Sequence, residues 1–231
     1  MKKLMTTVFL VLTFSLAGFA KESQLEKATN VHNEIMGTPD KGIPHDLLDR
    51  AVCVGIDPSE IEAAFIVGGT YGRGVLVCRR HGDSPWGAPS EFKMGVGSVG
   101  SQIGGESTDV VLGVMNTAGA RKFVQDDVKL GGNASVTAGP VGRSAEAATD
   151  AQLHAEILSY LRTRGLFAGV SLDGAVVKQD KEENKRLYAR ELRAEEILFE
   201  GGVRVPPEAV ALDAALARYS PRGGRPTASL H

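Results

Sequence analysis

The chain has 231 residues, of which 42% are hydrophobic and 23% are charged, and its formal charge is −2. This balance is typical of a globular protein that buries one sizeable core, and no internal repeat or low-complexity linker is present. No dense basic cluster indicates a nucleic-acid partner.

The first 20 residues have the pattern of a secretory signal peptide. Lys2 and Lys3 precede a short apolar run, Val8 to Phe14, and the small residues Gly18 and Ala20 precede a charged segment. We therefore expect cleavage near residue 20 and a mature protein that is exported, either to the periplasm or into the medium. No cysteine follows the expected cleavage point, so the signal of a bacterial lipoprotein is absent.

Charge is unevenly distributed along the expected mature chain. Without the two leader lysines, 24 basic and 28 acidic residues remain, a formal charge of −4. Residues 63–145 hold eight Lys or Arg and six Asp or Glu, so the centre is mildly basic and the flanks are acidic. This pattern favours an anionic ligand at the centre of the chain.

An amphipathic helix is predicted over 24–36, because apolar residues recur there at helical spacing and Gly37 and Pro39 follow. Its polar face carries three glutamates and two lysines, so it lacks the basic face that anionic membrane surfaces select. We expect this helix to pack on the domain; the alternative is contact with a membrane.

Seventeen of the 28 glycines lie in residues 63–145, between short β-branched and apolar runs. Glycine at this density indicates many bends and close backbone contacts, as in tightly turned, curved antiparallel strands. A short helix is predicted at 44–50 and a buried strand at 51–56. Further strands are predicted at 63–67, 71–79, 91–99 and 109–116, a short helix at 119–126, and more strands within 128–137.

Residues 151–161 fit both a helix and a strand. Their apolar residues match a helical spacing, but Ile157, Ser159 and Leu161 also alternate with Leu158 and Tyr160. Gly165 and the apolar run at 166–172 favour a hairpin, so we predict strands.

The C-terminal part reads as helical. Charged residues interleaved with leucines predict one helix over 180–198, and Pro206 and Pro207 open a last helix that ends near Arg218. Residues 220–231 resemble a frayed tail. The expected organisation is a signal peptide at 1–20, a domain at 21–205 and a C-terminal helix and tail at 206–231.

Two cysteines, Cys53 and Cys78, lie in apolar, strand-like runs of a chain expected to be exported. A disulfide between them is one reading, because export leads to an oxidising compartment. Two buried free thiols are the other.

Local motifs for catalysis and for nucleotide or metal binding are weak. Gly95 to Gly100 matches the dinucleotide fingerprint G-x-G-x-x-G, but Gly104 and Gly105 prevent the helix that this site needs. The five histidines are scattered singly, so no local metal pair is present, and no nucleophile motif occurs. We therefore expect no enzyme activity, no cofactor and no metal.

Six separated motifs resemble the SYLF, or Ysc84-like, family in one collinear order across about residues 25–190. They are Phe65–Leu76, Gly97–Gly104, Thr108–Asn116, Ala138–Arg143, Ala155–Tyr160 and Gly165–Ala175. Eukaryotic members are known for binding phosphoinositides and, in some fungi, actin, and bacterial members are commonly exported and regarded as lipid binding. The resemblance implies phospholipid binding; an exported bacterial protein would meet no actin.

Candidate ligand contacts are of two kinds. Basic residues next to glycines or at a helix start can hold an anionic headgroup; these are Arg73, Arg143, Arg121, Lys122 and Lys129. The alternative for these residues is ordinary ion pairing with Asp109, Asp126 or Asp127. Large apolar side chains can line a site for acyl chains, or else form core; these are Tyr71, Trp86, Phe92 and Phe167.

Together these observations predict an α+β domain, with a curved antiparallel sheet or partial barrel over about 51–177 flanked by N- and C-terminal helices. The expected function is non-enzymatic phospholipid binding. The alternatives are a structural or protein-interaction module of the cell envelope, and an enzyme that modifies lipid or envelope components.

Overall fold

The structure is a computed structural model that describes residues 22–38, 42–58, 69–80, 84–97, 108–142, 152, 154–163 and 166–221. The predicted signal peptide, the predicted strand at 63–67 and Arg143 lie outside the described residues.

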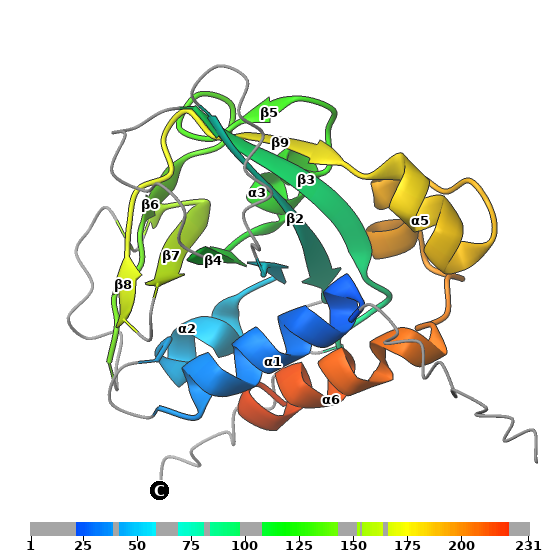
Figure 1. Cartoon of the computed structure of the whole chain (residues 1–231), viewed down its shortest axis with the longest axis horizontal. Coiled ribbons are helices and arrows are strands. Elements are labelled where there is room, and N and C mark those ends of the chain that lie inside the picture. Colours follow the sequence, from blue (N-terminus) through cyan, green and yellow to red (C-terminus); the bar gives the residue numbers. More distant parts are fainter. Residues whose placement is uncertain are drawn as a thin grey trace, which may run out of the picture.

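One curled sheet of nine strands organises the part of the chain that the structure describes (Figure 1). The strand order is β5-β9-β3-β2-β1-β4-β7-β6, and β8 also pairs with β7. Among the described strands, β6 pairs with β7 in parallel and the other pairs are antiparallel, so the sheet is mixed. The α+β class and the partial barrel flanked by terminal helices are thus confirmed. The strands are β1 (Cys53–Asp57), β2 (Gly69–Cys78), β3 (Ser90–Gly97), β4 (Thr108–Val114), β5 (Val128–Lys129), β6 (Val136–Ala138), β7 (Ile157–Thr163), β8 (Leu166–Gly169) and β9 (Val176–Gln179).

Both faces of the central strands are buried, which explains their unbroken apolar runs. On β4, Val110 and Leu112 join one buried cluster, whereas Val111 between them joins the other. The first cluster also contains residues of α3 (Thr117–Phe123). The second is completed by α1 (Gln24–Met36), α2 (His45–Arg50) and α6 (Val210–Tyr219).

Helix α1 packs on the domain, as expected from its polar face. Ser23 caps its N-terminus by accepting a hydrogen bond from the Glu26 amide at 3.1 Å, and Gly37 ends it. Its apolar stripe is buried against α6 and the sheet, and α1 and α6 lie side by side in Figure 1. The last helix follows a 3-10 turn, η3 (Pro207–Ala209), and shares one buried cluster with α1. No helix in the described part of the chain has the length and hydropathy to cross a membrane.

The single helix predicted over 180–198 is wrong, because the segment is divided. Helix α5 (Lys181–Tyr188) ends at Ala189, which has a left-handed backbone with φ of 53°. A π-helical turn, η2 (Glu196–Glu200), follows. Tertiary anchors explain the break: Asn184 is hydrogen-bonded to β3, whereas Ile197 and Leu198 enter the core.

The ambiguous segment at 151–161 contains a strand, as predicted. Strand β7 pairs with β4 along seven residues and forms a hairpin with β8. The alternation of the sequence places Leu158 and Tyr160 in one cluster and Ile157 in the other. This register decides which side chains reach the site described below.

Cys53 and Cys78 are directly opposite each other on β1 and β2 and form a disulfide. Both cysteines are fully buried, and they are 25 residues apart in the sequence. In the chain-entropy account such a cross-link stabilises the fold by about 3 kcal/mol.

Candidate functional site

Arg73, the first predicted headgroup contact, lies exposed on β2 beside carboxylates of α5. Its Nη1 is 3.5 Å from Oε1 of Glu183, and its Nε is 3.9 Å from Oδ2 of Asp180. A hydrogen bond with Tyr71, together with the two carboxylates, raises the pKa of the guanidinium. Arg73 is therefore engaged in an ion-pair network, and so is its neighbour Lys93, whose Nζ is 3.0 Å from Asp180.

The charged groups around Asp180 attach α5 to the sheet. The Asp180 carboxylate accepts a hydrogen bond from the Glu183 amide at 3.3 Å and so caps α5. Asn184 accepts a hydrogen bond from the amide of Glu91 at 2.7 Å. Burial, and then the charges of Glu183 and Asp180, raises the pKa of Glu91 to about 7. The packing of α5 against the sheet accounts for these contacts. They therefore give no indication of a ligand site around Asp180.

The other predicted cations are distributed over separate elements. Lys122 on α3 pairs with Glu156 at 2.7 Å, and Arg121 pairs with Glu195 at 3.7 Å. Lys129 is exposed on β5, and Arg143 is outside the described residues. The partners that the sequence suggested, Asp109, Asp126 and Asp127, instead meet Arg162, Lys181 and Lys178.

Three of the four predicted chain contacts lie away from any pocket that the structure describes. Trp86 is buried, donates its indole N–H to the Ser220 carbonyl at 3.3 Å, and lies 4.0 Å from the Arg79 guanidinium. Phe92 packs edge-on against Phe123 in the core. Tyr71 is half-buried and forms a side-chain hydrogen bond with Arg73. The fourth, Phe167, stacks on Tyr160 with ring centres 5.2 Å apart.

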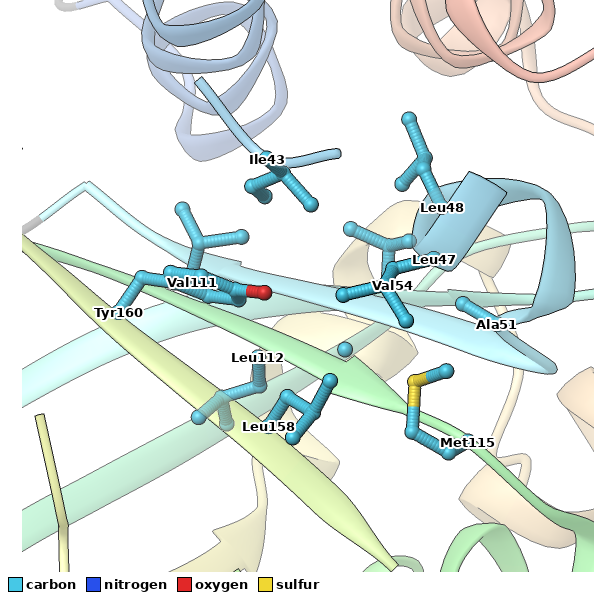
Figure 2. A pocket seen from close by; sticks show the side chains of 11 residues that line it. Ile43, Leu47, Leu48, Ala51, Val54, Val111, Leu112, Met115, Leu158 and Tyr160 are labelled. Atoms are coloured by element: carbon cyan, nitrogen blue, oxygen red, sulfur yellow. The ribbon is translucent and has the colours of Figure 1, made fainter. Parts of the chain in front are cut away.

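Tyr160 leads to an apolar pocket between α2 and the sheet, which we call the α2 pocket (Figure 2). Strands β1, β4 and β7 form its floor, and α2 with the preceding Ile43 covers it. The space measures about 10 Å³, about the volume of one water-sized sphere. It is lined by Ile43, Leu47, Leu48, Ala51, Val54, Val111, Leu112, Gly113, Met115, Leu158 and Tyr160.

The Tyr160 hydroxyl is the polar group of this pocket. Figure 2 shows its oxygen pointing into the pocket, toward Val54. The side chain is 1% exposed, and the hydroxyl has no hydrogen-bond partner among the residues that the structure describes. The pKa of the phenol is raised, mainly by burial and to a smaller extent by the negative charge of Asp46. The hydroxyl therefore stays protonated at neutral pH.

The ring of Tyr160 is fixed by its neighbours. One contact is the stacked Phe167, and another is Gly139, where an added methyl group would overlap the ring. Tyr160 therefore cannot easily turn its hydroxyl away from the pocket. The sequence held one signal for this residue, the alternation on β7, but did not reveal that α2 would cover it.

No cluster of three or more potential metal ligands is present among the described side chains. The weak dinucleotide match places Gly95 to Gly97 in the antiparallel strand β3, which differs from the strand-to-helix turn that such a site needs.

Comparison with known proteins shows similarity to one family. A family model described as "Ysc84: Las17-binding protein actin regulator" matches residues 95–219. In Saccharomyces cerevisiae, LAS seventeen-binding protein 3 is 40% identical over 179 residues, covering 76% of this chain and 38% of the relative. The yeast protein YSC84 is 36% identical over 197 residues, which cover 81% of this chain and 41% of the relative.

A human relative, SH3 domain-containing YSC84-like protein 1, is 33% identical over 214 residues, covering 88% of this chain and 62% of the relative. The chain thus spans less than two thirds of the length of these relatives. The name of the first yeast relative describes binding to LAS seventeen, and that of the human relative describes an SH3 domain.

Proposed function

The chain belongs to the Ysc84 family, and on this premise we propose that it is a non-enzymatic binding module whose ligand is phospholipid. The observation that carries the proposal is the α2 pocket, which combines an apolar lining with one buried hydroxyl. Sites for small amphiphiles have this composition, mostly apolar with a few polar groups that fix orientation.

Hydrocarbon contact, rather than headgroup charge, is the main attraction in this proposal. Arg73, Arg121 and Lys122 already have carboxylate partners. Because these carboxylates offset their positive charge, the three side chains add little attraction for an anionic headgroup. Lys129 remains as an exposed cation that can add a weak headgroup contact.

We also propose that the mature protein works outside the cytoplasm, in the periplasm or the medium. The leader pattern of residues 1–20 and the disulfide between Cys53 and Cys78 support this placement. Mass spectrometry of the protein from the native host should find a new N-terminus near residue 21 and both cysteines oxidised. A full-length cytoplasmic protein with reduced cysteines would refute the placement.

A second candidate function is binding of a protein partner. It is favoured by the yeast relatives that are named for binding LAS17. Capture of one specific protein partner by the purified chain in detergent, where lipid is removed, would support this reading.

Co-sedimentation with vesicles tests the lipid proposal. The purified mature chain is mixed with vesicles of phosphatidylcholine and with vesicles of equimolar phosphatidylcholine and phosphatidylglycerol. We expect sedimentation with both kinds of vesicle, because hydrocarbon is common to them. A chain that stays in the supernatant with both would contradict the proposal.

A further inference from the structure

We propose that the α2 pocket is the closed form of a binding site for one acyl chain, with Tyr160 donating a hydrogen bond to the ester carbonyl. Helix α2 is the element that moves outward to admit the chain. This inference rests on the proposed lipid function and assigns it to a place and to a chemical group.

The hydroxyl of Tyr160, which has no hydrogen-bond partner among the described residues, is the first observation that points to a ligand. A buried hydroxyl without a partner is unfavourable, because it has given up its bonds with water and gained none. Phenylalanine would fill the same space without this cost. A carbonyl that reaches the pocket would satisfy the hydroxyl of Tyr160, which is 1% exposed.

A bound water does not explain the hydroxyl. Buried waters are held by two to four polar groups, and the other side chains that line the pocket are apolar. The space of about 10 Å³ would fit one water but offers it only Tyr160 as a side-chain partner. The pocket is therefore suited to hydrocarbon with one polar atom.

Helix α2 is suited to act as a movable cover. It has only six residues, and no side chain caps its N-terminus at Pro44. Leu47 and Leu48 face the pocket, whereas His45, Asp46, Asp49 and Arg50 are exposed. Outward motion of α2 would leave Val54, Val111 and Leu158 as an apolar floor for the chain.

Two polar contacts of α2 among the described residues lie at the side that faces α6. His45 Nδ1 is 3.2 Å from the carbonyl of Tyr219, and the Ser220 hydroxyl donates to the Leu48 carbonyl at 3.2 Å. Both connect α2 to the end of α6. The contact of its two leucines with the sheet is apolar packing, which an acyl chain can replace with similar contacts.

The carbonyl of an ester suits the pocket better than the carboxylate of a free fatty acid. The Tyr160 hydroxyl is a donor at neutral pH, and the nearby Asp46 disfavours a second negative charge. A neutral ester carbonyl accepts the hydrogen bond without this repulsion. The ligand class is therefore an esterified acyl chain, and octanoate serves as the free-acid comparison.

The test uses a soluble lipid, diheptanoyl phosphatidylcholine below its micelle concentration, with binding measured by calorimetry on the mature chain. Tyr160→Phe removes the donor and keeps the ring, so affinity should fall roughly fivefold, the effect of one hydrogen bond. Gly113→Val fills the pocket, where a Cβ has room at 3.7 Å from the Met115 sulfur, and should abolish measurable binding.

Tyr188→Phe is the matched control, because Tyr188 is half-buried and donates its hydroxyl to the Pro89 carbonyl at 2.5 Å, away from the α2 pocket. It should bind the lipid like the wild type. Circular dichroism checks that all variants fold. Wild-type affinity in both Tyr160→Phe and Gly113→Val, or octanoate bound as tightly as the ester, would overturn the inference.

Vesicle sedimentation separates this inference from the proposed function. If the wild type sediments with vesicles but binds no soluble lipid, the acyl site is wrong and lipid binding stands. If it neither sediments nor binds soluble lipid, both proposals fail.

Discussion

Two buried ionisable side chains respond to pH in opposite directions. His32 on α1 is 2% exposed; it contacts the ring of Tyr219, and no described residue forms a hydrogen bond with its Nε2. Burial lowers its pKa from 6.5 to about 4, against a smaller opposing effect of a hydrogen bond to the Ala215 backbone. Glu91 on β3 is 8% exposed, and its pKa is raised from 4.5 to about 7.

The folded and unfolded chains protonate His32 and Glu91 at different pH values, and this difference sets how each residue changes the free energy of unfolding with pH. The unfolded chain protonates His32 near pH 6.5 but the folded chain only near pH 4, so its contribution to stability is complete above 6.5 and is lost toward 4. The folded chain protonates Glu91 near pH 7 but the unfolded chain only near 4.5, so its contribution is complete below 4.5 and is lost toward 7.

We predict that His32→Leu and Glu91→Gln change the pH dependence of stability in opposite directions. As pH falls from 6.5 to 4.5, the free energy of unfolding of His32→Leu should rise relative to the wild type, by on the order of 1 kcal/mol per pH unit. That of Glu91→Gln should fall relative to the wild type. Urea unfolding at a series of pH values measures both, and curves parallel to the wild type would contradict the assignment.

At the scale of elements, the sequence predicted those whose pattern is local. Helix α1 has its bounds from the apolar spacing and from Gly37, and β7 follows the alternation around Ser159. The division between α5 and η2 was missed, because charged helix-forming residues continue through Ala189. Contacts of Asn184 with β3, distant in sequence, fix that break.

Helix α6 is held at its C-terminus by one buried guanidinium. Arg79, which is 2% exposed, donates to the Ser220 carbonyl at 2.6 Å, to the Ser220 hydroxyl at 2.7 Å and to the Ser84 carbonyl at 2.9 Å. It also lies over Trp86. A cation at the C-terminal end of a helix is favourable, and the planar guanidinium serves several acceptors at once.

We predict that Arg79→Met lowers the free energy of unfolding by on the order of 3 kcal/mol, because several buried acceptors lose a charged donor. Arg79→Lys should recover part of the loss, since an ammonium lacks the fork of the guanidinium. Hydrogen exchange should show the largest loss of protection in α6. Arg80→Met, at an exposed neighbour, is the control and should change stability by less than about 0.5 kcal/mol.

At the scale of the whole molecule, the sequence predicted the curved sheet and its flanking helices but not the environment of the candidate site. The glycine-rich runs and the terminal helices were readable locally. The ion pairs were not: Arg73 and Glu183 are 110 residues apart, and Lys122 and Glu156 are 34 apart. The cover of α2 over Tyr160 likewise depends on tertiary packing.

These pairings determine how binding to vesicles should depend on salt. The mature chain carries a formal charge of −4 if the leader is removed, and most of the predicted headgroup cations are paired. Raising the salt concentration from about 0.1 M to about 1 M shortens the Debye length from about 10 Å to about 3 Å, which removes charge attraction and leaves hydrocarbon contact.

We predict that the bound fraction on phosphatidylcholine vesicles stays the same or increases over this range, and that adding phosphatidylglycerol does not strengthen binding. Lys129→Ala should have little effect, because the headgroup contact of one exposed cation is weak. Co-sedimentation across the salt series, with Gly113→Val as the variant that lacks the acyl site, measures the dependence. Binding that requires phosphatidylglycerol and disappears at high salt would show instead that paired arginines such as Arg73 open to meet the headgroups.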